Sequence, residues 1–198
     1  MLFIIGLSIV ALLALPENAR AQHFAPVDKG STIQFSIPYN KAKLAGAFNH
    51  IKGKITFDPA HLEQASFDVT VDAMSLVTGD KDNDAQLKSS SFFNVAKFPS
   101  VHFKSTSVTQ DRPGSIVFVV NGNLTIKGIT KPITLDVEFN GINKDPYGND
   151  KAGFDFKAVI NRSEYQLNWN VPLETGGLLV SNDVKIFGGV QLAKQKEA

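Results

Sequence analysis

Apolar and polar residues alternate one by one along most of the chain that follows residue 21. Such alternation is typical of antiparallel strands that bury one face and expose the other. The pattern is found at residues 33–37, 47–58, 67–72, 101–104, 133–139, 154–160 and 184–192. The segment 116–120 is instead apolar on both faces, which predicts a second layer of structure over its outer side. Together these segments predict about eight strands.

Turn-forming sequences separate the predicted strands, and only one stretch has helical character. Asn121-Gly122, for example, predicts a tight turn. Residues 82–90 predict a short helix, because Asp82 suits the start of a helix and Pro99 prevents any continuation. The sequence therefore predicts an all-β protein with one short helix near residues 82–90.

Eight strands that are each apolar on one face fit a closed barrel or a two-sheet sandwich. A barrel removes the exposed strand edges, and the interior of an eight-stranded barrel is filled by side chains or holds one small ligand. Periodicity does not decide which face points inward, so a membrane barrel with an apolar exterior is an alternative. Charged residues on most of the polar faces would be costly against lipid. We therefore predict an extended eight-stranded antiparallel barrel with an apolar interior that does not span a membrane.

The first residues of the chain have the features of an export signal. Residues 2–15 are almost wholly apolar, and a run of this length is too short to cross a bilayer comfortably. Ala19-Arg20-Ala21 then matches the A-x-A pattern of a cleavage site, although no Lys or Arg precedes the apolar run. We predict a signal peptide, 1–21, cleaved after Ala21, a single barrel domain, 22–198, and a periplasmic location. A retained N-terminal anchor is the alternative.

Composition adds three constraints to this picture. The chain has 20 basic and 19 acidic residues among 198, and a net charge of +1 gives no support for nucleic-acid binding. The absence of cysteine excludes disulfides, thiolate nucleophiles and Cys-ligated metal sites. Aromatic residues comprise 15 Phe, three Tyr and one Trp. Because Phe supplies bulk without a polar atom, this bias favours an apolar core or a cavity for an apolar guest.

The chain carries no recognisable catalytic or metal-binding motif. The four histidines, His23, His50, His61 and His102, form no HxH or HExxH pair, so solvated surface positions are expected for them. The Asp-rich run 80–84 lacks the glycine and the glutamate that a calcium loop requires, and is interpreted as a helix cap. We therefore predict a non-enzymatic protein with no metal and no cofactor.

Two longer segments resemble a known family. The run from Asp84 to Thr106 and the run from Gly122 to Leu135 are similar to the hallmark segments of the YceI-like, polyisoprenoid-binding family. Shorter matches lie at 46–58, 69–78, 160–162 and 176–186. The resemblance implies a lipocalin-like barrel with one helix near its mouth, export, and a lumen that holds a long-chain isoprenoid or a similar amphiphile. It implies no catalytic residue, and it admits a homodimer.

Three positions depart from the family's usual residues. Gln86 stands where His is usual, Ser91 where Asp is usual, and Tyr39 where many members carry His. If these side chains contact a ligand, the resemblance implies an altered preference for the polar head group.

The leading hypothesis is an exported carrier that shelters a polyprenyl, quinone-like or fatty-acyl lipid in the barrel. Inward-facing apolar side chains are expected to line the lumen: Phe35, Ile37, Phe57, Phe67, Val69, Phe103, Phe118, Phe139, Phe154 and Phe156. Phe92, Phe93 and Trp169 are expected to border its mouth. The alternative is a structural or interaction protein of the cell envelope, active in a stress response, with a solid core and no ligand. An enzyme acting on a bound lipid is a weaker third hypothesis.

Overall fold

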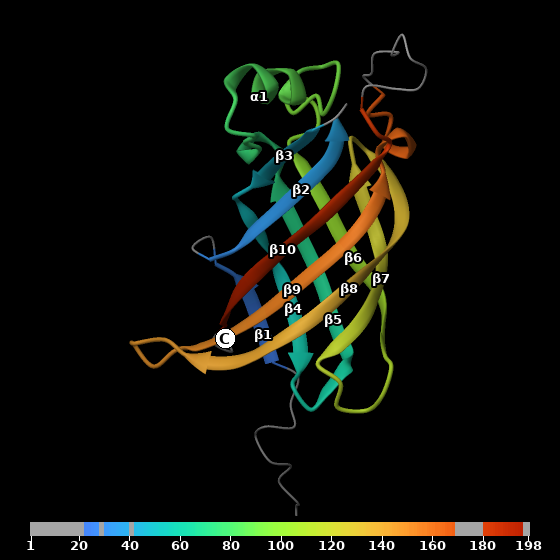
Figure 1. The fold of residues 1–198 in the computed structure, drawn as a ribbon. Coiled ribbons are helices and arrows are strands. Elements are labelled where there is room, and N and C mark those ends of the chain that lie inside the picture. Colours follow the sequence, from blue (N-terminus) through green and yellow to red (C-terminus); the bar gives the residue numbers. More distant parts are fainter. Residues whose placement is uncertain (1–21, 28–29, 40–41, 169–179, 196–198) are drawn as a thin grey trace, which may run out of the picture.

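The computed structural model describes residues 22–27, 30–39, 42–168 and 180–195. They form ten strands, one α-helix and two short 3-10 helices (Figure 1). The strands are β1 (Gln22–Pro26), β2 (Thr32–Tyr39), β3 (Ala42–Phe48), β4 (Ile51–Asp58), β5 (His61–Asp72), β6 (Ser100–Gln110), β7 (Val117–Ile126), β8 (Ile129–Lys144), β9 (Asp150–Asn161) and β10 (Asp183–Lys194). The helices are η2 (Ala73–Ser75), α1 (Lys81–Lys88) and η3 (Arg162–Tyr165). The predicted signal peptide and Trp169 lie outside the described residues.

The ten strands make one closed antiparallel barrel. β1 and β2 follow one another along the same edge of β10, and β4 and β3 pair with β1 and β2 in the same order. Two pairs of short strands therefore act as two interrupted long strands. Together with β5 to β10 they close a ring of eight, which confirms the predicted eight-stranded barrel.

Hydrogen bonds bridge both interruptions. Between β1 and β2, the buried Ser31 hydroxyl donates to the Gln191 carbonyl at 3.1 Å and accepts the Gln191 amide at 2.9 Å. Between β3 and β4, the Asn49 and His50 amides both donate to the Ser75 hydroxyl. These contacts keep the barrel closed where strand pairing stops.

Two predictions about β7 are wrong. Asn121-Gly122 forms no turn, because both residues lie within the strand and pair with β6 and β8. The Phe103 ring occupies the space that a side chain at position 122 would need, so Gly122 is required for close packing. The apolar outer side of 116–120 carries no second layer among the described residues, since Ile116 and Val117 are 52% and 51% exposed.

The helix α1 lies over one end of the barrel (Figure 1). It spans residues close to the predicted 82–90, and the Asp80 side chain caps it by accepting from the Asp82 and Asn83 amides at 3.0 and 2.8 Å. The Asp84 carboxylate accepts from the Thr78 amide and hydroxyl at 2.6 and 2.7 Å. These bonds to Thr78 hold the pKa of Asp84 below its usual range. The acidic run is therefore a helix cap, as expected.

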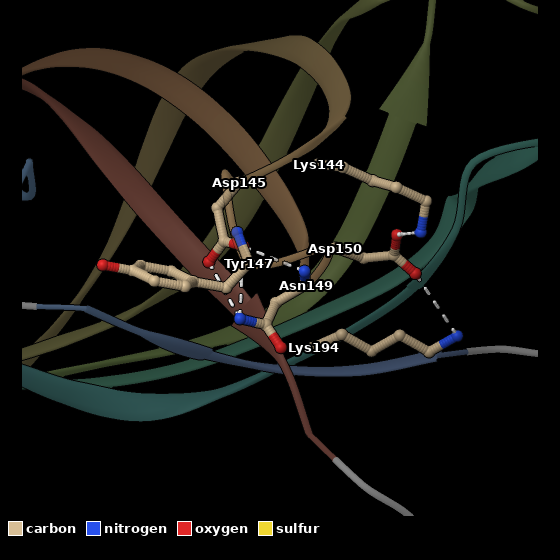
Figure 2. A network of polar contacts seen from close by, with 6 residues as sticks. All are labelled: Lys144, Asp145, Tyr147, Asn149, Asp150 and Lys194. Carbon is tan, nitrogen blue, oxygen red and sulfur yellow. Dashed lines mark hydrogen bonds and ion pairs between the residues drawn. The ribbon is translucent and has the colours of Figure 1, made fainter.

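At the other end of the barrel, the β8–β9 hairpin closes in a network of polar contacts (Figure 2). The Asp145 carboxylate accepts from the Tyr147 and Asn149 amides, each at 2.9 Å, and from the Asn149 side chain. Lys144 contacts Asp150 at 2.7 Å. The hydrogen bonds to Asn149 lower the pKa of Asp145. The turn is thus fixed in one conformation, with Tyr147 89% exposed at its tip.

Candidate ligand-binding site

The upper half of the barrel, towards α1, contains a cavity of about 240 Å³. Side chains from each of the strands β2 to β10 line it, together with α1 and the segment that follows the helix. A dry cavity of about 150 Å³ with apolar walls is already large enough to bind benzene. The barrel is therefore hollow enough at this end to hold part of an apolar guest.

Seven of the ten side chains predicted to line a lumen contact this cavity: Phe35, Ile37, Phe67, Val69, Phe103, Phe154 and Phe156. Phe92 and Phe93, predicted at the mouth, also line it from the segment after α1. The structure thus brings together residues from β2, β5, β6 and β9 that lie far apart in the sequence.

The structure places Phe57, Phe118 and Phe139 in a packed core below the cavity, and they are not among its lining residues. They are only 0%, 2% and 8% exposed. Phe57 contacts Phe139 with ring centroids 5.5 Å apart, and both rings contact Phe154 at 5.1 Å. Edge-to-face and tilted contacts at these distances fill the lower barrel with aromatic rings. Their inward orientation follows the predicted alternation, but a strand pattern does not indicate the depth at which a cavity ends.

The cavity ends at a definite residue on six of the strands around it. On β7 the last inward residue that lines it is Val120, and the next, Phe118, belongs to the core cluster. On β8 the same change occurs between Val137 and Phe139. Corresponding changes occur on β4, β5, β9 and β10, after Ile55, Phe67, Phe154 and Val190. The barrel is therefore hollow above these residues and solid below them.

Few of the described lining residues are polar, and those few lie towards α1. They are Tyr39 at the end of β2, Asn83 and Gln86 on α1, and Arg162 at the start of η3. Amides and a phenol can both donate and accept hydrogen bonds, whereas a guanidinium only donates. An apolar chamber with polar groups at one end suits an amphiphile whose polar head lies near α1.

Arg162 is buried at this end of the barrel and is 2% exposed. Its Nε atom donates to the Ser181 carbonyl at 2.8 Å, Nη2 donates to the Val180 carbonyl at 3.3 Å, and Nη1 donates to the Leu167 carbonyl. Burial lowers the pKa of Arg162, but an arginine remains charged in a protein. Arg162 therefore holds Leu167 and Val180, which both line the cavity, against the end of β9.

Tyr165, three residues later in η3, is fully buried, and its hydroxyl makes no hydrogen bond to any residue that the structure describes. Burial raises the pKa of Tyr165 to about 12. Its ring packs with Leu124, Ile126 and Ile160 behind the cavity wall. Tyr165 is therefore a wall-supporting residue that does not itself line the cavity.

A family model described as a YceI-like domain matches residues 25–192. The chain belongs to the YceI-like family. The match covers every residue that lines the cavity, so the chamber is part of the YceI-like domain itself.

Relatives and solved structures agree with this membership. A UPF0312 protein of Yersinia pestis is 34% identical over 167 residues, which cover 83% of this chain and 85% of the relative. The crystal structure of BcnA from Burkholderia cenocepacia is similar with a TM-score of 0.72 at 24% identity, over 84% of this chain and 98% of that one. A polyisoprenoid binding domain from Saccharophagus degradans, implicated in plant cell wall breakdown, has a TM-score of 0.62 at 11% identity, over 89% and 100% of the two chains. Because both identities are below 25%, these two structures show only that the fold is shared.

Two of the positions that depart from the usual YceI-like residues contact each other. The Gln86 side-chain amide donates to the Ser91 hydroxyl at 3.1 Å, and Ser91 also lies 2.7 Å from the Ser89 hydroxyl. Tyr39, the third departure, lines the cavity as Gln86 does. The departures therefore fall at the polar end of the cavity, where an exchange of side chains alters the hydrogen-bonding groups without changing the apolar walls.

Several lining residues were not singled out from the sequence. Ile133, Leu135, Val184 and Ile186 lie on the apolar faces of predicted strands, so their alternation did contain the signal. For Leu44 and Phe48 there was little signal, because β3 contains alanine and glycine at several positions and its alternation is weak. Arg162 gave none, since a charged residue is rarely expected in the wall of an apolar cavity.

Neither a metal centre nor a membrane helix is found in the described part of the chain. Residues 22–27, 30–39, 42–168 and 180–195 contain no cluster of three or more histidine and carboxylate side chains suited to a metal ion. Within the same ranges no helix has the length and apolar character needed to cross a bilayer.

Proposed function

We propose that the protein is a lipid-binding barrel that holds the hydrocarbon tail of one isoprenoid or similar amphiphile in its upper cavity. The observation that carries this proposal is the chamber itself, enclosed by barrel strands and lined almost entirely by apolar side chains. Binding is favourable because a hydrocarbon chain that enters such a chamber moves its apolar surface out of water.

Burial of the hydrocarbon tail supplies the driving force for binding. A tail that removes about 400 Å² of apolar surface from water gains about 10 kcal/mol before costs, at about 25 cal/mol per Å². The loss of freedom on association and the ordering of a flexible chain offset part of this gain. No covalent step is needed, so the proposed role is binding without catalysis.

The polar end of the cavity supplies contacts for a head group. Tyr39, Asn83 and Gln86 lie at the α1 end and offer both donors and acceptors. Lipids with an oxygen-bearing head, such as prenyl alcohols, quinones or fatty acids, match this arrangement. The binding activity named for the Saccharophagus degradans domain is a reason to include isoprenoids among the ligands tested.

The proposal places the protein in the periplasm as a carrier. Support for export comes from residues 1–21 alone, through their apolar run and the Ala19-Arg20-Ala21 pattern. A carrier that shields a tail from water fits a compartment that a lipid must cross between membranes.

The alternative is a ligand-free protein of the cell envelope. The observation that favours it is the solid lower half of the barrel, where packed aromatic rings leave no cavity.

The direct test is organic extraction of the gently purified protein, followed by mass spectrometry of the extract. We expect about one equivalent of an isoprenoid or acyl lipid per chain. An empty protein that also takes up no prenyl or acyl lipid when offered one would contradict the proposal and favour the ligand-free alternative.

A further inference from the structure

The base of the cavity is made of five phenylalanine rings, which we call the aromatic floor: Phe57, Phe67, Phe118, Phe139 and Phe154. Phe67 and Phe154 belong to the cavity wall and to the core below it. Their centroids are 5.5 Å apart, and Phe118 contacts both from beneath, at 6.3 and 6.1 Å. The rings meet mostly edge to face, so they fill the barrel cross-section.

The aromatic floor is supported from below and does not open to solvent. Phe24 on β1 stacks on Phe57 with centroids 4.6 Å apart, and both rings are 0% exposed. Leu62 and Leu192 complete the same core cluster at 3% and 0% exposure. A tail that enters from the α1 end therefore stops at Phe67 and Phe154.

The depth of the chamber follows from the strands that line it. On β10 the lining residues extend from Val184 to Val190, and on β7 from Ile126 to Val120. Each stretch is about 20 Å long at about 3.3 Å per residue. Strands of such barrels tilt by about 40°, so the chamber is about 15 Å deep along the barrel axis. This depth equals about half of a bilayer's hydrocarbon core, which is about 30 Å thick.

We propose that the aromatic floor limits the length of the tail that the cavity accepts. The preferred ligands are then single-chain amphiphiles whose tail matches one membrane leaflet, such as a short prenyl or an ordinary acyl chain. A long polyprenyl tail meets the floor while part of it is still outside the barrel. That part stays in water and displaces the head group from Tyr39 and Gln86. This inference rests on the proposed lipid binding and specifies the class of lipid.

The test compares prenyl alcohols of increasing length, namely farnesol, geranylgeraniol and solanesol, on the purified full chain. Each alcohol is offered separately from detergent, and its dissociation constant is measured by native mass spectrometry. We expect geranylgeraniol to bind at least about tenfold more tightly than solanesol. Solanesol binding as tightly as geranylgeraniol in the wild-type protein would overturn the length limit.

Two variants move the floor in opposite directions. Phe154→Ala removes the ring at the base of the cavity, so solanesol should gain affinity relative to geranylgeraniol. Val137→Phe adds a ring just above the floor, so geranylgeraniol should lose affinity relative to farnesol. If Phe154→Ala does not fold, Val137→Phe still tests the limit. An unchanged order of affinities in the folded variants would overturn the proposal.

Phe187→Ala is the matched control, because it removes a phenylalanine ring that is 37% exposed, contacts no ring of the floor and does not line the cavity. Its order of affinities should remain that of the wild-type protein, and a shift as large as that of Phe154→Ala would contradict a role for the floor. The two proposals fail differently. If none of the alcohols and no fatty acid binds, lipid binding itself is wrong; if all bind with equal affinity, only the length limit is wrong.

Discussion

Asp58 and His61 fix the turn between β4 and β5 through a charged hydrogen bond. His61 Nδ1 lies 3.0 Å from the Asp58 carboxylate, which also accepts the Ala60 amide at 2.9 Å. The bond to Asp58 raises the pKa of His61, and the bond from His61 lowers the pKa of Asp58. Because Asp58 is buried while His61 is half exposed, this pair connects the turn to the base of the barrel.

The pair predicts a defined pH window of added stability. Because the pKa of His61 is raised, the stability that His61 adds to the folded state is complete below about pH 6.5. It is lost as the pH rises through the folded-state pKa of His61. The lowered pKa of Asp58 means that its contribution is complete above about pH 4 and is lost at more acidic pH. We expect His61→Ala to lower the melting temperature more at about pH 5.5 than at about pH 8.5. Thermal melts at the two values measure this, and an equal loss at both would contradict the account.

At the scale of elements, Arg162 joins three parts of the chain at the α1 end of the barrel. Its guanidinium donates to carbonyls of Leu167, Val180 and Ser181, next to the end of β9 and the start of β10. We expect Arg162→Met to lower the free energy of unfolding by about 2–4 kcal/mol, because buried carbonyls lose their donors. Urea unfolding measures the change.

The matched control for Arg162 is Arg112, which is exposed in the β6–β7 turn. Arg112→Met should change the free energy of unfolding by less than about 0.5 kcal/mol. Arg162→Lys tests the geometry, since one ammonium cannot reproduce the planar fork that reaches three carbonyls. Full stability of Arg162→Lys would contradict the role assigned to that fork.

The elements also differ in how well the sequence predicts them. β8 and β9 follow from alternation alone, because each keeps a polar outer face over many residues. The division of one long strand into β1 and β2 did not follow, since the bridge through Ser31 and Gln191 depends on residues 160 positions apart. The sequence predicted a turn at Gly122, because local turn preferences take no account of distant residues. In the folded barrel the Phe103 ring packs against Gly122.

At the scale of the whole molecule, the barrel is solid at one end and hollow at the other. Phe139 and Leu135 stand four residues apart on the same face of β8, yet one packs in the core and the other lines the cavity. The charges on the polar faces could therefore predict which face points inward, but nothing in the sequence pattern predicts which inward residues leave space. That division depends on how rings from β4, β5, β7, β8 and β9 meet once the barrel has closed.

The most direct test of the central claim compares one added ring in the hollow half with one in the solid half. Leu135→Trp should fold with nearly wild-type stability and lose the bound lipid, because the indole fills the chamber. Leu62→Trp should lose about 1–3 kcal/mol by overpacking the core. Lipid per folded chain, measured by native mass spectrometry, should fall from about one to near zero in Leu135→Trp alone. A Leu135→Trp protein that keeps its full equivalent of lipid would contradict the claim that the upper cavity is the binding site.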